Sequence, residues 1–402
     1  MADLWPIREL GAVGVSVLDC EHKTPVRTEQ GYPYVAIPNL IEGRLSLENV
    51  RLISAEDFEI WTRRTRPCPG DVILTRRGRV GDSAVVPDGL SCAIGQNLVI
   101  LRSTGKLIDQ AYLRWALRGP QWAAEVDRLH NVGAIFDSLN VSDIPRMRIS
   151  LPPMRFQKAI AAMLGALDDK ISANQKLART ALALAQAKYD KFAAGETWHA
   201  VSMNESAQWL SGGTPSTTEP SYWDGDIPWI SALSLKSPWI NDSERKVTAL
   251  GAENGTRLVP KNAVIFVVRG SSLDTEFRIG ITQRSVAFGQ DCKALIAAEG
   301  VDPVMLFLAI RSCSSDILNM VDHTGHGAGR LATDLISNVI VKLPGSSSDW
   351  MICEELGRLV DVGANRQNEN CILLLLRDAL LPRIMSGEIR IRDAERIVES
   401  AT

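Results

Sequence analysis

The sequence lacks a long apolar run, paired cysteines and a strong excess of either charge. No stretch approaches the roughly 20 apolar residues needed to span a bilayer, and the first residues carry neither a basic start nor an apolar signal core. The seven cysteines are scattered without a C-x-x-C pair, a pattern typical of free thiols in a reducing cytoplasm. We therefore expect a soluble, cytoplasmic protein that is not exported.

The motifs of several enzyme classes are also missing. There is no G-x-x-x-x-G-K-[ST] loop to cradle phosphates. Amine methyltransferases place a polar residue before Pro-Pro and an aromatic residue after it, whereas Leu151-Pro152-Pro153-Met154 has apolar neighbours on both sides. His323 and His326 lie near Cys313 in the sequence, but a closed zinc site needs four ligands. We expect no catalytic residue, no metal and no cofactor in this chain.

The composition is that of a globular protein. The 402 residues are 45% hydrophobic and 23% charged, with a formal net charge of −3, which predicts two or three folded domains. The near-neutral charge argues against a chain coated in positive charge. It is compatible with a nucleic-acid binder, because local basic patches matter more than the sum.

Comparison of the sequence with itself shows a duplication with a period of about 192 residues. Thr24-Pro25 returns as Thr214-Pro215, and Gly95-Gln96-Asn97 returns as Gly289-Gln290-Asp291. Downstream the offset stays constant over a set of identical residues: Ile160, Leu164, Leu167, Asp169, Gln175, Leu182, Ala187, Gly195 and Glu196 match Ile352, Leu356, Leu359, Asp361, Gln367, Leu374, Ala379, Gly387 and Glu388. The chain is therefore two copies of one unit.

The first part of each copy is predicted to be a β-rich α+β globule. Short apolar runs bounded by Gly, Asp and Pro indicate strands, at 72–75, 98–101 and 147–151 in the first copy and at 264–268, 294–296 and 339–341 in the second. Helical stretches lie between them at 109–129 and 304–321.

The second part of each copy is predicted to be a long helix. The run 155–192 contains no Pro and is rich in Ala, Leu, Lys and Gln. The matching helix is expected to run from Met351 to about Leu381, where Pro382 should end or kink it. An apolar seam at heptad spacing predicts that the two helices pack as an antiparallel coiled coil; its residues are Ile160, Leu164, Leu167, Ile171, Leu356, Leu359, Leu373 and Leu376. We also expect hydrogen bonds between the polar segments 174–176 and 365–370 across this pair.

These elements divide the chain into four expected parts. The first globule spans 1–153, the first spacer helix 154–194, the second globule 195–346, and the second spacer helix with a C-terminal tail 347–402.

This duplicated plan resembles the specificity subunit of Type I restriction–modification systems, a protein with two target-recognition domains. The resemblance extends from about residue 10 to 392 and rests on an ordered set of segments: 19–25, 212–216, 222–231, 69–73, 151–153 and 380–389. One departure is Pro260-Lys261-Asn262, which lacks the Gly of the first copy's Pro69-Gly70-Asp71. Because Gly permits a positive φ, the turn geometry in the second copy is an open question.

The resemblance implies a non-catalytic protein that recognises double-stranded DNA. Each globule would read one half of a split target, and the helices would set the gap and dock two methyltransferase subunits. Two restriction subunits with motor and nuclease activity would join them in a bacterial or archaeal cytoplasm, without contact with a membrane. S-adenosylmethionine, ATP and Mg are then expected only on the partner subunits. The alternatives are a duplicated coiled-coil adaptor that binds proteins without DNA specificity, and a methyltransferase too diverged to recognise.

Under this resemblance, basic and amide residues beside predicted strands are the DNA-binding candidates. The segment 61–82 holds six arginines against two aspartates; in an arbitrary protein this is more often a solvated loop, but arginine also binds phosphates and guanine. The first globule contributes Lys23, Thr24, Arg63, Arg64, Arg76, Arg77, Arg79, Asn97 and His130. The second contributes Thr214, Arg269, Ser271, Arg278, Arg284, His323, His326 and Arg330.

Some of these candidates have equally ordinary structural interpretations. His130 and His323 recur at the same place in both copies, and either would serve as a DNA donor or as a helix cap. Asn97 can read adenine, although the more frequent role of such an amide is to satisfy a turn backbone.

Overall fold

The computed structural model describes residues 5–129, 138–323, 328–345 and 349–401. The chain forms two compact units. Unit 1 comprises residues 1–171 and 372–402, and unit 2 comprises residues 172–371. Both long helices therefore contribute one half to each unit. Among the described residues, no helix combines the length and the apolar character needed to cross a bilayer.

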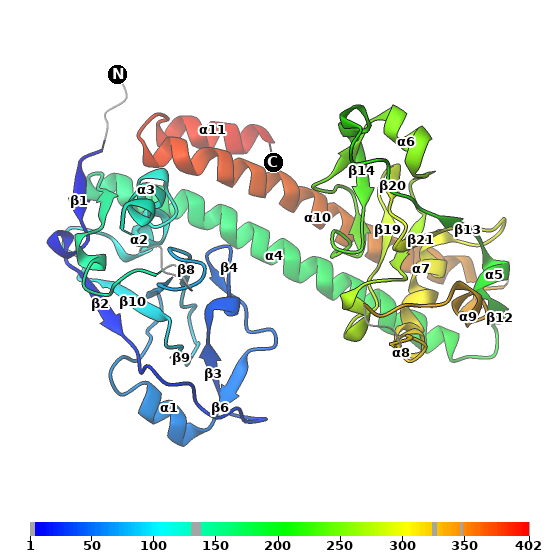
Figure 1. Cartoon of the computed structure of the whole chain (residues 1–402), viewed down its shortest axis with the longest axis horizontal. Helices are drawn as coiled ribbons and strands as arrows, with labels where there is room; N and C mark the ends of the chain where they lie inside the picture. The colour runs from blue at the N-terminus through cyan, green and yellow to red at the C-terminus, as the bar shows by residue number, and fades with distance from the viewer. Residues whose placement is uncertain (1–4, 130–137, 324–327, 346–348, 402) are drawn as a thin grey trace. The chain divides into compact units, whose positions relative to one another are not determined.

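Unit 1 is built on a six-stranded sheet in the order β2-β10-β7-β8-β5-β4 (Figure 1). Its strands are β2 Val15–Asp19, β10 Leu98–Ser103, β7 Val72–Thr75, β8 Ser83–Val85, β5 Arg44–Leu45 and β4 Leu40–Ile41. Two smaller sheets join it: β6 Arg51–Ile53, β3 Tyr32–Val35 and β9 Ala93–Ile94; and β1 Ile7–Glu9 with β11 Arg148–Ser150. The short helices are α1 Ala55–Trp61, α2 Gln110–Ala116 and α3 Pro120–Leu129.

Unit 2 repeats this plan with a five-stranded sheet in the order β13-β21-β18-β19-β15. Its strands are β13 Ala207–Ser211, β21 Cys292–Ala297, β18 Val264–Val267, β19 Ile279–Thr282 and β15 Trp239–Ile240. The other sheets are β16 Lys246–Val247, β14 Trp223–Ile230, β20 Val286–Phe288 and β17 Leu258–Val259; and β12 His199–Ser202 with β22 Ile340–Leu343. The short helices are α5 Met203–Ser206, α6 Ala249–Gly255, α7 Pro303–Ser312, α8 Ser314–Leu318 and α9 Thr333–Ser337.

Strand register confirms the duplication and the α+β class. β7 is antiparallel to β10 with Ile73 opposite Ile100, and β18 is antiparallel to β21 with Ile265 opposite Ala294. Each of the six expected strands lies within two residues of an observed one. The expected helix 109–129 is divided between α2 and α3, because Pro120 begins a new helix and disfavours the helical conformation in the residue before it.

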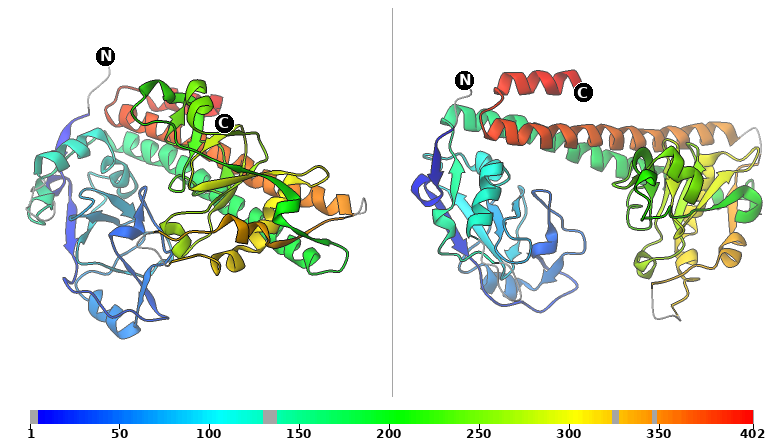
Figure 2. Two further views of the ribbon diagram at one scale, coloured as in Figure 1. Left: turned by 45° about the vertical axis from the view of Figure 1, so that its right-hand side comes forward. Right: turned by 45° about the horizontal axis from the view of Figure 1, so that its top comes forward.

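The two long helices, α4 (Met154–Ala193) and α10 (Trp350–Met385), pack side by side and run antiparallel (Figures 1 and 2). In unit 1, Asp168 of α4 pairs with Arg377 of α10 at 3.0 Å between Oδ1 and Nη1. In unit 2, Lys188 pairs with Glu355 at 2.6 Å between Nζ and Oε1. The residue number on α10 falls as that on α4 rises, as the antiparallel prediction requires.

The apolar seam is shared between the helix pair and the globules. Ile160, Leu164, Leu167 and Ile171 lie in the core of unit 1 together with Leu373, while Leu356 and the partly buried Leu359 lie in the core of unit 2. Leu376 is half-buried. Each half of the helix pair therefore belongs to the core of a unit, whereas the seam alone predicted only contacts between the helices.

The expected end of the second helix near Leu381 is wrong. α10 includes Pro382 and continues to Met385. Proline removes one N–H donor from the helix, but the neighbouring Leu380, Leu381, Ile384 and Met385 are buried and anchor this last turn. Gly387 then ends the helix at φ +77°, and the expected tail forms a further helix, α11 (Ile391–Ala401).

Two further expectations concern polar positions. Asn174 and Asn370 are both buried in unit 2, as the expected contact between the polar segments requires; the hydrogen bonds themselves stay a prediction. Asn368 instead accepts a hydrogen bond from Asn241 Nδ2 at 2.9 Å.

The turn that lacks glycine is preserved, because Asn262 adopts φ +68° where Gly70 adopts φ +84°, and asparagine tolerates this conformation better than most residues.

Candidate nucleic-acid interface

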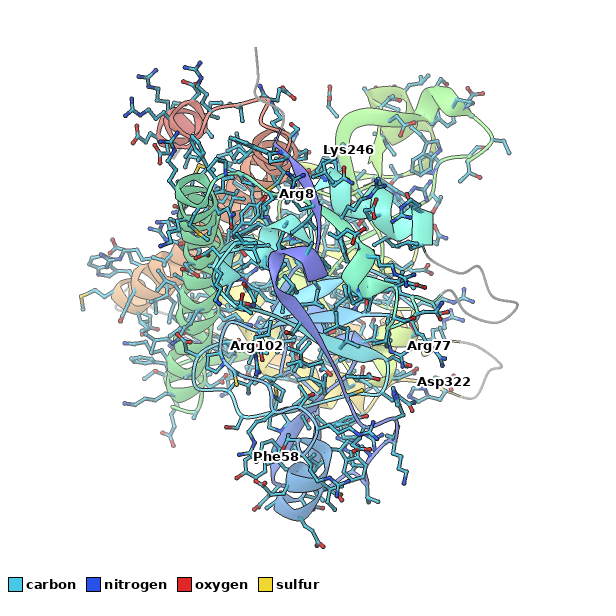
Figure 3. All side chains as sticks on the ribbon, turned by 90° about the vertical axis from the view of Figure 1, so that its left-hand side faces the viewer. Arg8, Phe58, Arg77, Arg102, Lys246 and Asp322 are labelled. Carbon is cyan, nitrogen blue, oxygen red and sulfur yellow. The ribbon has the colours of Figure 1, made fainter. Side chains whose placement is uncertain are left out.

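A basic segment follows the central strand of the main sheet in each unit. In unit 1, Arg76 N–H donates to Asn97 O at 3.0 Å, and Arg76 O accepts from Leu139 N–H at 2.9 Å. Arg77, the next residue, is exposed and forms a backbone bridge with Ser138. Figure 3 shows Arg77 at the surface of unit 1.

Unit 2 repeats this arrangement with different residues. Val268 N–H donates to Asp291 O at 2.9 Å, and Val268 O accepts from Leu331 N–H at 2.8 Å. The following Arg269 is exposed and forms a backbone bridge with Arg330. Arg77 and Arg269 thus occupy equivalent positions. Neither side chain has a hydrogen bond or ion pair within the described parts of the chain, so both are available for a ligand.

Unit 2 gathers several predicted residues around Arg269. Gly270 N–H donates to Gly329 O at 3.1 Å, which brings Ser271 close to the segment that carries Arg330. His323 lies beside the same segment, with its Nδ1 3.5 Å from Asp274 Oδ1. This combination of exposed arginine, hydroxyl and imidazole groups suits phosphate oxygens and base edges. His326 and His130 lie outside the described residues.

Two of the arginines predicted as DNA-binding candidates donate hydrogen bonds to the backbone carbonyls of a turn. Arg79 Nη2 donates to Ile37 O and to Leu40 O, the latter at 2.7 Å. Arg278 Nη1 donates to Ala232 O at 3.3 Å in the equivalent turn of unit 2. The same bond in both copies gives these two arginines a structural role.

Carboxylates from other segments partly neutralise the arginine-rich stretch of unit 1. Glu21 lies 3.9 Å from Arg63 Nη2 and 3.2 Å from Arg64 Nε, measured from its Oε1. Arg66 pairs with Glu59 at 2.7 Å. The charge count over 61–82 omitted both glutamates, so the positive charge available at this surface is smaller than the sequence indicates.

The amide and hydroxyl candidates line a cavity in unit 1. Its volume is about 560 Å³, and its walls include Thr24, Asn97, Tyr34 and Pro38. The adjoining Lys23 has an exposed side chain, and its carbonyl accepts hydrogen bonds from Tyr34 and Trp61. In unit 2, Thr214 donates to Gln290 in the matching place. The structure therefore brings the Thr-Pro and Gly-Gln motifs together in each unit.

Arg284 lies apart from the Arg269 cluster. It follows the end of β19, which pairs antiparallel with β18 so that Ile281 faces Val264 at the beginning of β18. Arg269 follows the opposite end of β18. The sequence grouped the two arginines because it could not show this reversal of direction.

His22 is a neighbour of the basic segment that sequence reasoning did not select. Arg76 Nη2 donates to Gln96 O at 3.2 Å and to His22 Nδ1 at 3.4 Å, and His22 Nε2 lies 3.0 Å from Asp19 Oδ2. The available signal was its position inside the segment 19–25 that contributes to the family resemblance.

Asp19, Cys20 and His22 also form a group of possible metal ligands within the described parts of the chain. Cys20 is buried, and its Sγ donates to Gly95 O at 3.2 Å. Burial, reinforced by the charge of Asp19, raises the pKa of the Cys20 thiol to about 11. Because the thiolate is the form that binds metals, this group is poorly suited to hold an ion.

Known proteins resemble this chain in sequence over part of its length. No family model matches the chain. The chain is 28% identical over 158 residues to the Type I restriction enzyme EcoR124I/EcoR124II specificity subunit of Escherichia coli, a match that covers 39% of each protein. It is 24% identical over 181 residues to the Type I restriction enzyme MjaIX specificity subunit of Methanocaldococcus jannaschii, covering 44% of this chain and 41% of that one. The matches thus span about two fifths of these relatives.

The fold has a solved counterpart over nearly the whole chain. The S subunit of a Type I restriction–modification system from M. genitalium superposes with a TM-score of 0.60 at 16% identity, covering 96% of this chain and 97% of that one. This likeness extends the resemblance from the matched segments to the duplicated architecture. In sequence over about two fifths of its length, and in fold over nearly the whole chain, the protein is similar to specificity subunits of Type I restriction–modification systems.

Proposed function

We propose that the chain recognises a two-part sequence in double-stranded DNA, with one half read by each unit. The observation that supports this most strongly is the equivalence of Arg77 and Arg269. Both are exposed, both follow the central strand of the main sheet, and both lack a side-chain partner within the described ranges. Their surroundings differ: the segment beside Arg269 supplies Arg330 and His323, whereas Arg77 adjoins Arg76 and the Thr24–Asn97 cavity. Two similar frames with different contacts suit two different half-sites.

In the proposed function, this chain is non-catalytic and acts within a complex. Two methyltransferase subunits would dock on the helix pair, and two restriction subunits would join through them. S-adenosylmethionine, ATP and Mg would be bound by these partners. The relatives in E. coli and M. jannaschii are both named specificity subunits, which supports this division of labour.

The adenine methylome tests the proposed function directly. Source cells with and without this chain are compared by single-molecule sequencing. We expect one split motif, two short half-sites around a fixed gap, to lose methylation when the chain is removed. An unchanged methylome in cells whose methyltransferase subunit is expressed would reject the proposal and favour the protein-binding adaptor. Methylation of DNA by the purified chain alone would show a diverged methyltransferase.

The two arginines test the assignment of one half-site to each unit. Arg77→Ala should relax or abolish recognition of one half-site, and Arg269→Ala that of the other, because loss of a guanine contact costs about 1–3 kcal/mol of discrimination. Arg396→Ala in α11 and Arg146→Ala before β11, which change exposed arginines away from these segments and from the helix pair, serve as controls. The assignment would be contradicted if either change alone abolished recognition of both half-sites. It would also be contradicted if recognition of both half-sites survived both changes.

A further inference from the structure

The turn after β14 exposes a leucine that the fold does not use. Leu233 is 76% exposed. Ser231 N–H donates to Ser234 Oγ at 2.8 Å, and Ser234 N–H donates to Ser231 Oγ at 3.2 Å, so the backbone is closed on both sides of Leu233. Leu235, two residues on, fills the adjacent core position and is buried. Leu233 therefore points outward from a turn that two hydrogen bonds close, while Leu235 occupies the core position beside it.

This turn adjoins the basic segment of unit 2. Arg278 binds Ala232 O, and a methyl group placed on Gly270 would lie 3.5 Å from Ala232 Cβ. The residue before Leu233 thus contacts the residue after Arg269. An exposed apolar side chain is held next to the arginine that is proposed to bind DNA.

Unit 1 holds an apolar residue in the same place. Pro38 is exposed in the turn Ile37–Asn39, which is closed by Ala36 N–H donating to Asn39 Oδ1 at 2.9 Å. A methyl group on Gly78, the residue after Arg77, would lie 3.6 Å from Ile37 Cδ1. The two turns differ in sequence but share three features. An arginine, Arg79 or Arg278, binds a backbone carbonyl of the turn, the turn contacts the basic segment, and the residue at its tip is apolar.

We propose that Leu233 is a wedge that inserts between neighbouring base pairs of the half-site read by unit 2, with Pro38 as its counterpart in unit 1. This inference rests on the proposed function. Leucine and proline are among the side chains that proteins insert between base steps. A wedge must resist the base stack, which requires an immobile backbone, and it needs cations beside it to hold the phosphates of the distorted step. The closed serine turn and the neighbouring Arg269 and Arg330 supply these two requirements.

The experiment uses the complex of this chain with its methyltransferase subunits and a duplex that carries the split motif found in the methylome. 2-Aminopurine, whose fluorescence rises when the base is unstacked, replaces one adenine at a time along the unit 2 half-site. The methylated adenine is left unchanged, because methyltransferases unstack their own target base. We expect a rise at one step on binding of the unchanged complex. Leu233→Ala should abolish this rise and, because it loses the burial of a leucine side chain, weaken binding by about tenfold. Leu233→Met should keep both the rise and the affinity. Leu258→Ala, which changes another exposed leucine of unit 2, should have no effect.

Several results would overturn the wedge. One is retention of the fluorescence rise by Leu233→Ala. A second is that the unchanged complex gives no rise and that Leu233→Ala weakens binding to a duplex with thymine but not to one with uracil. That result would show that Leu233 contacts a thymine methyl group. A third is loss of the methyltransferase subunits from the Leu233→Ala complex in the absence of DNA, which would show a protein contact. Absence of any split motif from the methylome would instead reject the proposed function, and the wedge with it.

Discussion

At the residue scale, one buried carboxylate of α4 contacts three other segments of unit 1. Asp168 of α4 is 1% exposed and contacts Arg377 of α10 and Arg114 of α2. Arg44 of β5 lies 3.7 Å from the same carboxyl group. Burial of an isolated charge is costly, so Asp168 depends on these arginines, of which Arg377 and Arg44 also contact Asp378 and Asp169. The sequence offered no sign of this cluster, because its members are distant in the chain.

Removal of this charge should therefore destabilise unit 1. Asp168→Asn leaves Arg377, itself 5% exposed, with only the more exposed Asp378 as an opposite charge, and breaking a buried ion pair from one side costs up to about 3–5 kcal/mol. Urea denaturation followed by circular dichroism measures the change in the free energy of unfolding.

The neighbouring residue provides the control. Asp169 is 83% exposed, and Asp169→Asn should change the free energy of unfolding by less than about 1 kcal/mol. Equal effects of the two changes would show that the buried cluster is not a net source of stability.

At the scale of elements, the two copies attach the globule to the helix pair by different means. The position of α10 that matches Asp168 is the buried Val360, whose carbonyl accepts a hydrogen bond from Trp239 Nε1 at 3.1 Å. The Trp239 ring lies directly against Gly363 of α10, so that a methyl group at Gly363 would overlap it. Unit 1 thus uses a charge cluster where unit 2 uses an indole ring seated on a glycine.

This contact predicts opposite effects for two helical glycines of α10. Gly363→Ala should destabilise unit 2 by about 1–3 kcal/mol because it displaces Trp239. Gly357→Ala, at a position with no atom within 4 Å of the added methyl group, should stabilise the helix by up to about 1 kcal/mol. Thermal unfolding of both variants measures the difference; stabilisation by both would show that the ring moves aside without cost.

Sequence patterns predicted the positions of the two long helices but not where the second one ends. The expected 155–192 agrees with α4 within one residue at each end, because helix propensity and apolar periodicity are local properties. The second helix passes through Pro382 because buried neighbours on α10 compensate for the missing donor. Such compensation depends on packing, which a local pattern does not contain.

At the scale of the whole molecule, the proposed function makes helix length the determinant of the gap between half-sites. Deletion of residues 173–179 from α4 and 365–371 from α10 removes two full turns from both helices and keeps their facing seams in phase. Each helix becomes about 10 Å shorter, and the gap in the methylated motif should shrink by up to about three base pairs.

Duplication of the same two segments should lengthen the gap and serves as the matched variant. Single-molecule sequencing of cells that carry each variant measures the motif. A methylated motif with an unchanged gap in both variants would show that the helices do not set the spacing.

The duplication, the α+β class and the positions of the long helices followed from local order along the chain. Periodicity, turn residues and a repeated motif order are all written in neighbouring positions, so the chain displays them before it folds. The family resemblance rests on the same ordered segments and was confirmed by the fold.

Contacts between distant segments decided which candidate residues remain available for the proposed contact with DNA. Arg79 and Arg278 bind backbone carbonyls, and Arg63 and Arg64 face Glu21. Arg284 lies at the opposite end of its hairpin from Arg269. The side chains of Arg77 and Arg269 have no partner within the described residues. In the sequence these arginines look alike, because a side chain's partners are set by segments that come together only on folding. For the same reason the exposed Leu233 and Pro38 became recognisable as a pair only when the two turns were seen beside their arginines.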